Sequence, residues 1–268
     1  MPPRRHWSDL TTEDFRRPNV AEWIAVLPVA AIEQHGPHLP LATDTIIAEG
    51  HVARAVERMP ANLPAVFLPV QSIAWSLEHV SSPGTLTLDW DTVTKVWLDI
   101  GGCVARSGLK KLVIVNAHGG NVPIMDLVIR ELRVRHDMLA VATSWSRFGR
   151  PHGLFDERER RYGIHGGDIE TSMVMALRPD LVRFEMLADF PSTQMQFEKE
   201  FAHLRAYGPS QFGWKAQDLN PTGAMGAAIA ATAAKGEAAI DHAVTGFIEL
   251  LSDVAAFSPD RLWKAPRR

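Results

Sequence analysis

Cysteine is nearly absent from this chain. Cys103 is the single cysteine among 268 residues, so the chain cannot form an intramolecular disulfide, and a zinc site made of several cysteines is excluded. Any metal site must therefore be built mainly from His, Asp and Glu side chains.

Long apolar segments and runs of one charge are also missing. No apolar run reaches membrane-spanning length, and residues 1–9 lack the apolar core of a signal peptide, so we expect a cytoplasmic protein that does not bind membranes. The net charge is -3 without a long basic run, which argues against nucleic acid as a partner. The remaining composition, 46% hydrophobic and 22% charged, is typical of a globular protein with a large core.

Predicted strands alternate with predicted helices along the chain. This alternation indicates an α/β fold with a mostly parallel sheet covered by helices on both faces. Residues 184–219 resist assignment because they show weak periodicity, and residues 147–162 are charged and interrupted by Gly and Pro. We interpret the latter as a surface excursion that could act as a lid. Strands are expected at 23–30, 64–70, 112–115 and 139–143, and helices at 11–17, 46–59, 91–107, 122–132, 169–177 and within 226–257.

Glu33, His35 and Asp44 follow the first predicted strand. Glu33 and His35 are two residues apart, so in an extended segment their side chains point the same way. Asp44 comes after a proline-containing bend that can return it to their side. Two carboxylates and an imidazole at a strand end can hold a divalent cation, which makes a metal-dependent enzyme the first hypothesis.

Two further polar segments follow predicted strands, residues 116–121 and 144–146. In parallel sheets, sites form just beyond the carboxyl ends of the strands, so all three segments are expected at one edge. His118 is then a candidate metal ligand beside two glycines, although the segment also fits a capped turn or a phosphate loop that lacks the P-loop Lys. Trp145 can close over a flat substrate or be a core residue.

Residues 165–172 contain another candidate cluster. Asp168 can cap the helix that follows, while Glu170 is placed to be a catalytic carboxylate or a further metal ligand. His165 is a candidate proton donor or substrate contact. His79, Trp145 and Asn121 are the residues we expect at the substrate, and His38 can line the approach to the metal.

The order and spacing of these motifs resemble the creatininase (creatinine amidohydrolase) family over roughly residues 20–250. The resemblance implies one α/β domain over residues 1–268, two divalent metals chosen from zinc, manganese and iron, and a homohexamer. The motifs that carry it are Glu33-Gln34-His35-Gly36-Pro37-His38-Leu39-Pro40 with Asp44, Glu78-His79 with Pro83-Gly84-Thr85, Asn116-Ala117-His118-Gly119-Gly120-Asn121, His165-Gly166-Gly167-Asp168-Ile169-Glu170-Thr171-Ser172, and the 223–236 stretch.

By position, the resemblance assigns Glu33, Asp44 and His118 to one metal, and His35 with the bridging Asp44 to the other. In creatininase proper, a Glu two residues after the motif histidine also binds the second metal. Gly120 stands there in this chain, which speaks against creatinine as the substrate. Glu170 is our candidate for the replacement ligand.

The expected reaction is hydrolysis of an amide-type C–N bond, in a cyclic amide or formamide, by a metal-bridging hydroxide. His165 would protonate the leaving nitrogen, and Glu170 would act as a base or as a ligand. The alternatives are ring opening of a lactone, cleavage of a C–C bond in a cyclic ketone, and peptidase activity. A dinucleotide-binding oxidoreductase is disfavoured, because a glycine-rich fingerprint does not follow the first strand. A non-catalytic metal-binding relative stays open.

Overall fold

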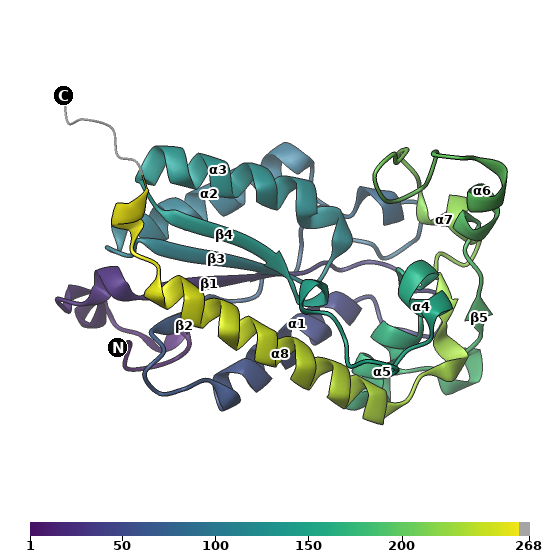
Figure 1. The fold of residues 1–268 in the computed structure, drawn as a ribbon, viewed down its shortest axis with the longest axis horizontal. Helices are drawn as coiled ribbons and strands as arrows, with labels where there is room; N and C mark the ends of the chain where they lie inside the picture. The colour runs from purple at the N-terminus through teal and green to yellow at the C-terminus, as the bar shows by residue number, and fades with distance from the viewer. Residues whose placement is uncertain (263–268) are drawn as a thin grey trace.

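Four parallel strands form the central sheet of the computed structural model, which describes residues 1–262 (Figure 1). Their spatial order is β2-β1-β3-β4, so β1 and β3 are the inner strands. The chain leaves β1 toward β2 on one side and returns to β3 on the other, which opens a crevice at the carboxyl ends of β1 and β3. The strands are β1 (Ile24–Val29), β2 (Ala65–Phe67), β3 (Lys111–Asn116) and β4 (Leu139–Ser144).

Helices cover both faces of the sheet. Successive residues of a strand point to opposite faces, so Ile24 and Val26 of β1 pack in one apolar cluster, and Ala25 and Leu27 in the other. The first cluster involves α1 (Thr43–Arg58), α5 (Asp168–Leu177) and α8 (Ala233–Ala256), and the second involves α2 (Trp90–Arg106) and α3 (Val122–His136). The predicted α/β class with a mostly parallel sheet is confirmed.

Pro28 lies inside the central strand β1. The carbonyl oxygens of Val26 and Pro28 accept hydrogen bonds from Leu68 and Gln71 on the β2 side of the strand. A backbone N–H at position 28 would point the same way, but β2 already ends at Phe67, opposite Val26. The proline therefore leaves the ladder between β1 and β2 intact.

A group of short elements lies beyond the carboxyl ends of the sheet strands (Figure 1). Strands β5 (Asp189–Phe190) and β6 (Gly226–Ala227) pair antiparallel there. The short helices are α4 (Glu157–Tyr162), α6 (Gln194–Glu200) and α7 (Ala216–Leu219). The 3-10 turns of the described residues are Trp7–Asp9, Thr12–Arg16, Val20–Glu22, Leu77–His79, Gly119–Asn121, Trp145–Phe148, Pro179–Leu181, Phe184–Met186, Ala228–Ala230 and Pro259–Arg261.

The short helix expected at residues 11–17 is the 3-10 helix Thr12–Arg16. Two expectations about local structure need correction. The helical region predicted from residue 226 begins as an α-helix only at Ala233, because residues 226–227 pair in β6 and the Thr232 side chain caps the helix by accepting the Lys235 N–H. Asp168 is the first residue of α5 rather than its cap, and its carboxylate accepts hydrogen bonds from Ser172 and Lys235.

The described part of the chain contains no helix with both the length and the apolar character needed to cross a membrane.

Candidate metal centre

The predicted ligands meet at the carboxyl ends of β1 and β3. Glu33 and His35 follow β1, and His118 follows β3. Asp44 and Glu170 come from the first turns of α1 and α5, where the helix dipole favours a negative side chain. Glu33, His35, Asp44 and His118 are each less than 5% exposed.

Glu33, Asp44 and His118 form the first group of donor atoms. The His118 Nδ1 atom lies 3.1 Å from Glu33 Oε1 and 3.5 Å from Asp44 Oδ2. The other ring nitrogen of His118 donates a hydrogen bond to the Trp75 carbonyl oxygen at 3.1 Å. Because the neutral ring carries one proton, this bond leaves the Nδ1 lone pair directed at the two carboxylates.

His35, Asp44 and Glu170 form the second group. His35 Nε2 lies 3.4 Å from Asp44 Oδ1 and 3.7 Å from Glu170 Oε2. His35 Nδ1 donates to the Glu33 carbonyl oxygen at 3.1 Å, which again leaves the other nitrogen free to coordinate. Asp44 therefore belongs to both groups, with a different oxygen facing each histidine.

Several polar atoms at the centre of this cluster lack protein partners. Glu33 Oε1, His35 Nε2 and Asp44 Oδ2 are buried and make no hydrogen bond in the described structure. Buried carboxylates that face one another need positive charge between them, from protonated His35 and His118 without metal or from a metal ion when one is bound, because a buried charge without a partner is costly. Nitrogen and oxygen donors of this kind fit zinc and manganese, so the residues present fit a divalent metal pair.

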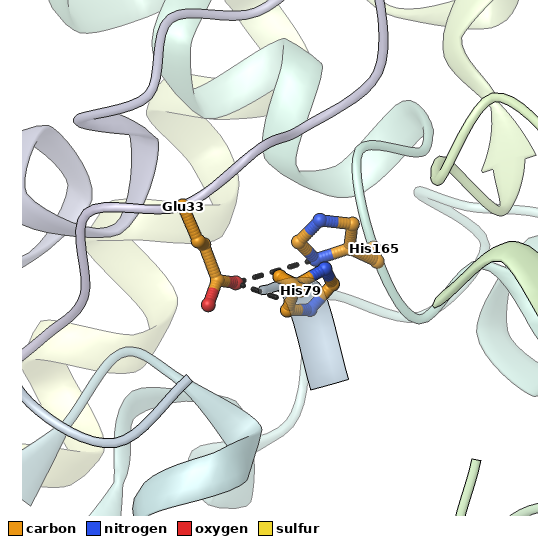
Figure 2. Close-up of side chains that lie close together, drawn as sticks. All are labelled: Glu33, His79 and His165. Carbon is orange, nitrogen blue, oxygen red and sulfur yellow. Dashed lines mark ion pairs between the residues drawn. The ribbon is translucent and has the colours of Figure 1, made fainter. Parts of the chain in front are cut away.

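A second layer of histidines lies behind Glu33. His79 Nε2 and His165 Nδ1 lie 3.5 and 3.6 Å from Glu33 Oε1 (Figure 2). The His165 ring stacks on His79 and on His35, with centroids 4.2 and 4.0 Å apart. Gln34 fixes this layer, because its side-chain amide nitrogen donates to His79 Nδ1 at 2.7 Å and its backbone carbonyl oxygen lies 2.5 Å from His165 Nε2. Glu33, His79 and His165 are thus a third set of donors close enough to share a cation.

A cavity of about 600 Å³ opens beside the metal centre. His118, Glu170 and Trp145 are among its lining residues, whereas His79, His165 and Asn121 are not. The Asn121 side chain is fully buried, donates to the Ala30 carbonyl oxygen at 3.0 Å and accepts from the Trp75 N–H at 3.4 Å. These bonds connect the β1, β3 and Trp75 segments that carry the ligands.

Trp145 and His38 also have clear structural surroundings. Trp145 is 2% exposed, stacks on His51 at 4.5 Å and packs against Phe247, so a core residue forms part of the cavity wall. His38 hydrogen bonds to Thr171 at 3.0 Å and stacks on Phe190. His38 therefore ties the segment after β1 to α5 and to β5.

Comparison with known proteins agrees with this geometry. The family model for creatininase, described as creatinine amidohydrolase, matches residues 8–251. The chain belongs to the creatininase family. It is accordingly a metal-dependent amidohydrolase of the creatininase type, and the resemblance inferred from the motifs is confirmed.

Two relatives and two solved structures illustrate the range of this family. The chain is 32% identical to a creatinine amidohydrolase of Pseudomonas putida over 200 residues, which are 68% of this chain and 75% of the relative. It is 29% identical to a mycofactocin precursor peptide peptidase of Mycolicibacterium smegmatis, over 95% and 93% of the two chains. A manganese creatininase (27% identity, TM-score 0.70) aligns over 93% of this chain and 98% of its own. A creatininase variant of the Zn-Zn type (28%, 0.72) aligns over 92% and 97%.

Creatininase proper has a Glu ligand where this chain has Gly120, and the structure leaves little room for a side chain at this position. A Cβ atom on Gly120 would meet the Glu78 carboxylate and His118 Nε2, and would lie 3.1 Å from the Trp75 carbonyl oxygen. Glu170 approaches the centre from α5 instead, and its carboxylate accepts the Gly166 N–H at 2.6 Å. This bond across the start of the helix holds the carboxylate facing His35.

Sequence reasoning missed three supporting residues of this creatininase-type site. Ser76 donates to Glu33 Oε2, and Gln34 holds the two outer histidines. Glu159 is 1% exposed and accepts N–H groups of Ile169 and Ala227 at 3.2 and 2.8 Å, which anchors the 163–169 segment. Gln34 lies inside a recognised motif, but Ser76 and Glu159 have no pattern that distinguishes them from surface residues.

The carboxylates control the charge of the two inner histidines. Burial lowers the pKa of His35, but Asp44, Glu170 and Glu33 raise it to about 9. Burial likewise lowers the pKa of His118, but Glu33 and Asp44 raise it to about 10. Metal binding must displace these protons, so metal affinity is expected to rise with pH.

The metal-free enzyme should lose stability as the pH rises from 7 to 10. A group whose folded pKa is raised contributes stability that is complete below its unfolded pKa, about 6.5 for histidine, and is lost as the pH passes through the folded value. For His35 and His118 that window ends near 9 and 10, and the loss is on the order of a few kcal/mol. Urea unfolding at a series of pH values, with the metal-loaded enzyme as control, measures it. A flat or rising metal-free profile would contradict the assignment.

Proposed function

We propose that this enzyme hydrolyses an amide-type C–N bond, in a cyclic amide or a formamide, of a small molecule. The observation that carries the proposal is the pair of donor groups that share Asp44 and border a cavity of about 600 Å³. A cavity of this size suits a small molecule. The family relationship supports amide chemistry, because the Pseudomonas putida relative is named as an amidohydrolase.

In this proposal Glu33, Asp44 and His118 hold one divalent ion, and His35, Asp44 and Glu170 hold the other. Bound ions of this kind supply an acidified water and polarise a carbonyl oxygen. The manganese and Zn-Zn creatininase structures support either metal, and iron also stays within the proposal. The protein's own contribution is to fix the donors through the Trp75 and Gly166 hydrogen bonds.

Glu170 and His165 are the proposed acid–base residues. In the metal-free protein burial raises the pKa of Glu170 to about 7, although His35 opposes the shift. If Glu170 acts on protons rather than as a ligand, a value near the working pH suits that role. Of the two, only Glu170 lines the cavity. Burial and His35 keep His165 neutral by lowering its pKa. In this role His165 would exchange a proton through Nδ1, its nitrogen nearer Glu33.

His79, Trp145 and Asn121 remain the proposed substrate-side residues. Trp145 supports this most directly, because it lines the cavity. His79 and Asn121 would act through the groups they hold, since both are buried behind the donor atoms. A homohexamer in the cytoplasm, acting on a small molecule, completes the proposal.

Metal removal is the decisive test of the proposed function. Chelation should abolish hydrolysis and lower the melting temperature, because a ligand that binds only the folded state stabilises it by about 2.7 kcal/mol at 100 times its Kd. Readdition of Zn²⁺ or Mn²⁺ should restore both. The assay uses creatinine, other cyclic amides, formamides and a lactone. Full amide hydrolysis after verified metal removal would reject the mechanism, and hydrolysis of the lactone alone would favour the ring-opening alternative.

Peptide hydrolysis is the second candidate function. The Mycolicibacterium smegmatis relative, which aligns over 95% of this chain, is named as a peptide peptidase. Short peptides therefore belong in the same assay. Metal-dependent peptide cleavage, without turnover of cyclic amides or formamides, would decide for this candidate.

A further inference from the structure

A half-buried arginine borders the cavity on the side formed by the 147–152 segment. Arg150 follows Gly149, whose φ of +78° is in the left-handed region that favours glycine. The 3-10 turn Trp145–Phe148 precedes this bend, and α4 begins at Glu157. Arg150, Gly149 and Glu170 all line the same cavity.

The Arg150 guanidinium is poorly satisfied by the protein. Its Nε atom is buried without a hydrogen-bond partner, and Nη1 donates to the carbonyl oxygen of the adjacent Gly149 at 2.7 Å. No carboxylate of the described residues lies within ion-pair distance of Arg150. Burial lowers the pKa of this guanidinium, and Glu170 is the acidic group that opposes the shift. Arginine stays protonated even so, and an unpaired, half-buried charge of this kind is stabilised when an anion binds beside it.

The surroundings add positive charge. Arg147 and Arg160 line the cavity as well, and Glu170 is the only carboxylate among the lining residues. The described structure shows no ion pair for either Arg147 or Arg160. A metal pair held by Glu170 and its neighbours would offset the negative charge of the metal-binding carboxylates. The 147–152 wall therefore keeps its positive charge when the site is loaded.

We infer that the substrate carries an anionic group, a carboxylate or a phosphate, which Arg150 binds while the scissile amide lies at the metal ligands. A planar guanidinium matches both anions with two parallel hydrogen bonds. The cavity has room for a substrate of this kind. Creatinine carries no acidic group, so the inference agrees with the doubt raised by Gly120. The inference rests on the proposed function for the position of the scissile amide. The binding of the anion by Arg150 does not depend on the proposed function.

Calorimetric titration of the metal-loaded enzyme with N-acetylglycine and with inorganic phosphate tests the inference without requiring turnover. At least one anion should bind, and the preferred one identifies the group. Arg150→Met should weaken that binding roughly tenfold to a hundredfold, since charge-assisted hydrogen bonds are lost. Arg150→Lys should recover part of it. Arg135→Met, the same charge change at an exposed ion pair with Glu131 on α3, should bind like the wild type.

The melting temperature separates ligand binding from a structural role. Arg150→Met should be as stable as the wild type or more so, because it removes a half-buried charge whose Nε atom has no hydrogen-bond partner in the described structure. The inference fails if neither anion binds. It also fails if the Arg150→Met variant binds the anion as tightly as the wild type does, because the anion would then be bound by the metals alone. Anion binding through Arg150 without hydrolysis of any panel amide would overturn the proposed function and leave the anion site standing.

Discussion

Replacing Asp44 with alanine should remove both metal ions from the enzyme and reduce turnover at least ~10³-fold. Asp44 faces His35 with one carboxylate oxygen and His118 with the other, at 3.4 and 3.5 Å. Loss of a shared ligand disrupts both donor groups, whereas loss of Glu33 or His35 disrupts one. Elemental analysis of the purified variant measures this directly, and full metal content would show that Asp44 does not bridge.

The stability of the Asp44→Ala variant distinguishes a ligand from a structural residue. Burial raises the pKa of Asp44, and Glu33 adds to that shift while His35 opposes it. Asp44 also favours the charged forms of His35 and His118 in the metal-free protein, so the metal-free variant should be less stable than the metal-free wild type at neutral pH. Added metal should stabilise the wild type and leave the variant unchanged. Asp91→Ala is the matched control, since Asp91 is also an acidic residue in the first turn of a helix but pairs only with exposed Lys95.

The positions of Glu33, His35 and His118 could be predicted because they depend on local rules. A run of six apolar residues, all buried in the structure, marks β1. Parallel strands place the residues that follow them at one edge of the sheet. Glu170 could be placed near the site in the same way, because it lies in the first turn of a predicted helix. These rules depend on the sequence close to each residue. They can therefore be applied without knowledge of the contacts between distant segments.

The outer parts of the site could not be predicted because they depend on contacts between distant segments. His165 lies between His35 and His79, from segments 130 and 86 residues away along the chain, and no spacing rule reports such a stack. Glu159 belongs to the charged 147–162 segment, yet it is buried, and Gly163, Gly167 and Gly226 leave the room that its carboxylate occupies. The short elements between residues 184 and 219 similarly depend on pairing with β6 and on neighbouring loops.

Replacing Glu170 with glutamine should lower the metal content from about two ions to about one per chain and reduce turnover about 10²–10³-fold. Glutamine has the same shape, and its amide oxygen can still accept the Gly166 N–H, so the fold of α5 should be kept. Its neutral oxygen is a weaker ligand for the ion beside His35. Metal analysis and turnover of the same preparation separate the two roles proposed for Glu170. Retained metal with lost turnover would assign it to proton transfer instead.

Two comparisons make the Glu170→Gln result specific. Glu157→Gln removes a carboxylate from the first turn of α4, so it repeats the change in helix electrostatics and should keep both ions and full activity. Adding Gly120→Glu to Glu170→Gln should not restore the second ion, because Glu78 and the Trp75 carbonyl oxygen fill the space that a side chain at position 120 needs. Recovery of the second ion in that double variant would show that a carboxylate at position 120 can bind the metal in this enzyme. The fold would then not require that this ligand come from α5.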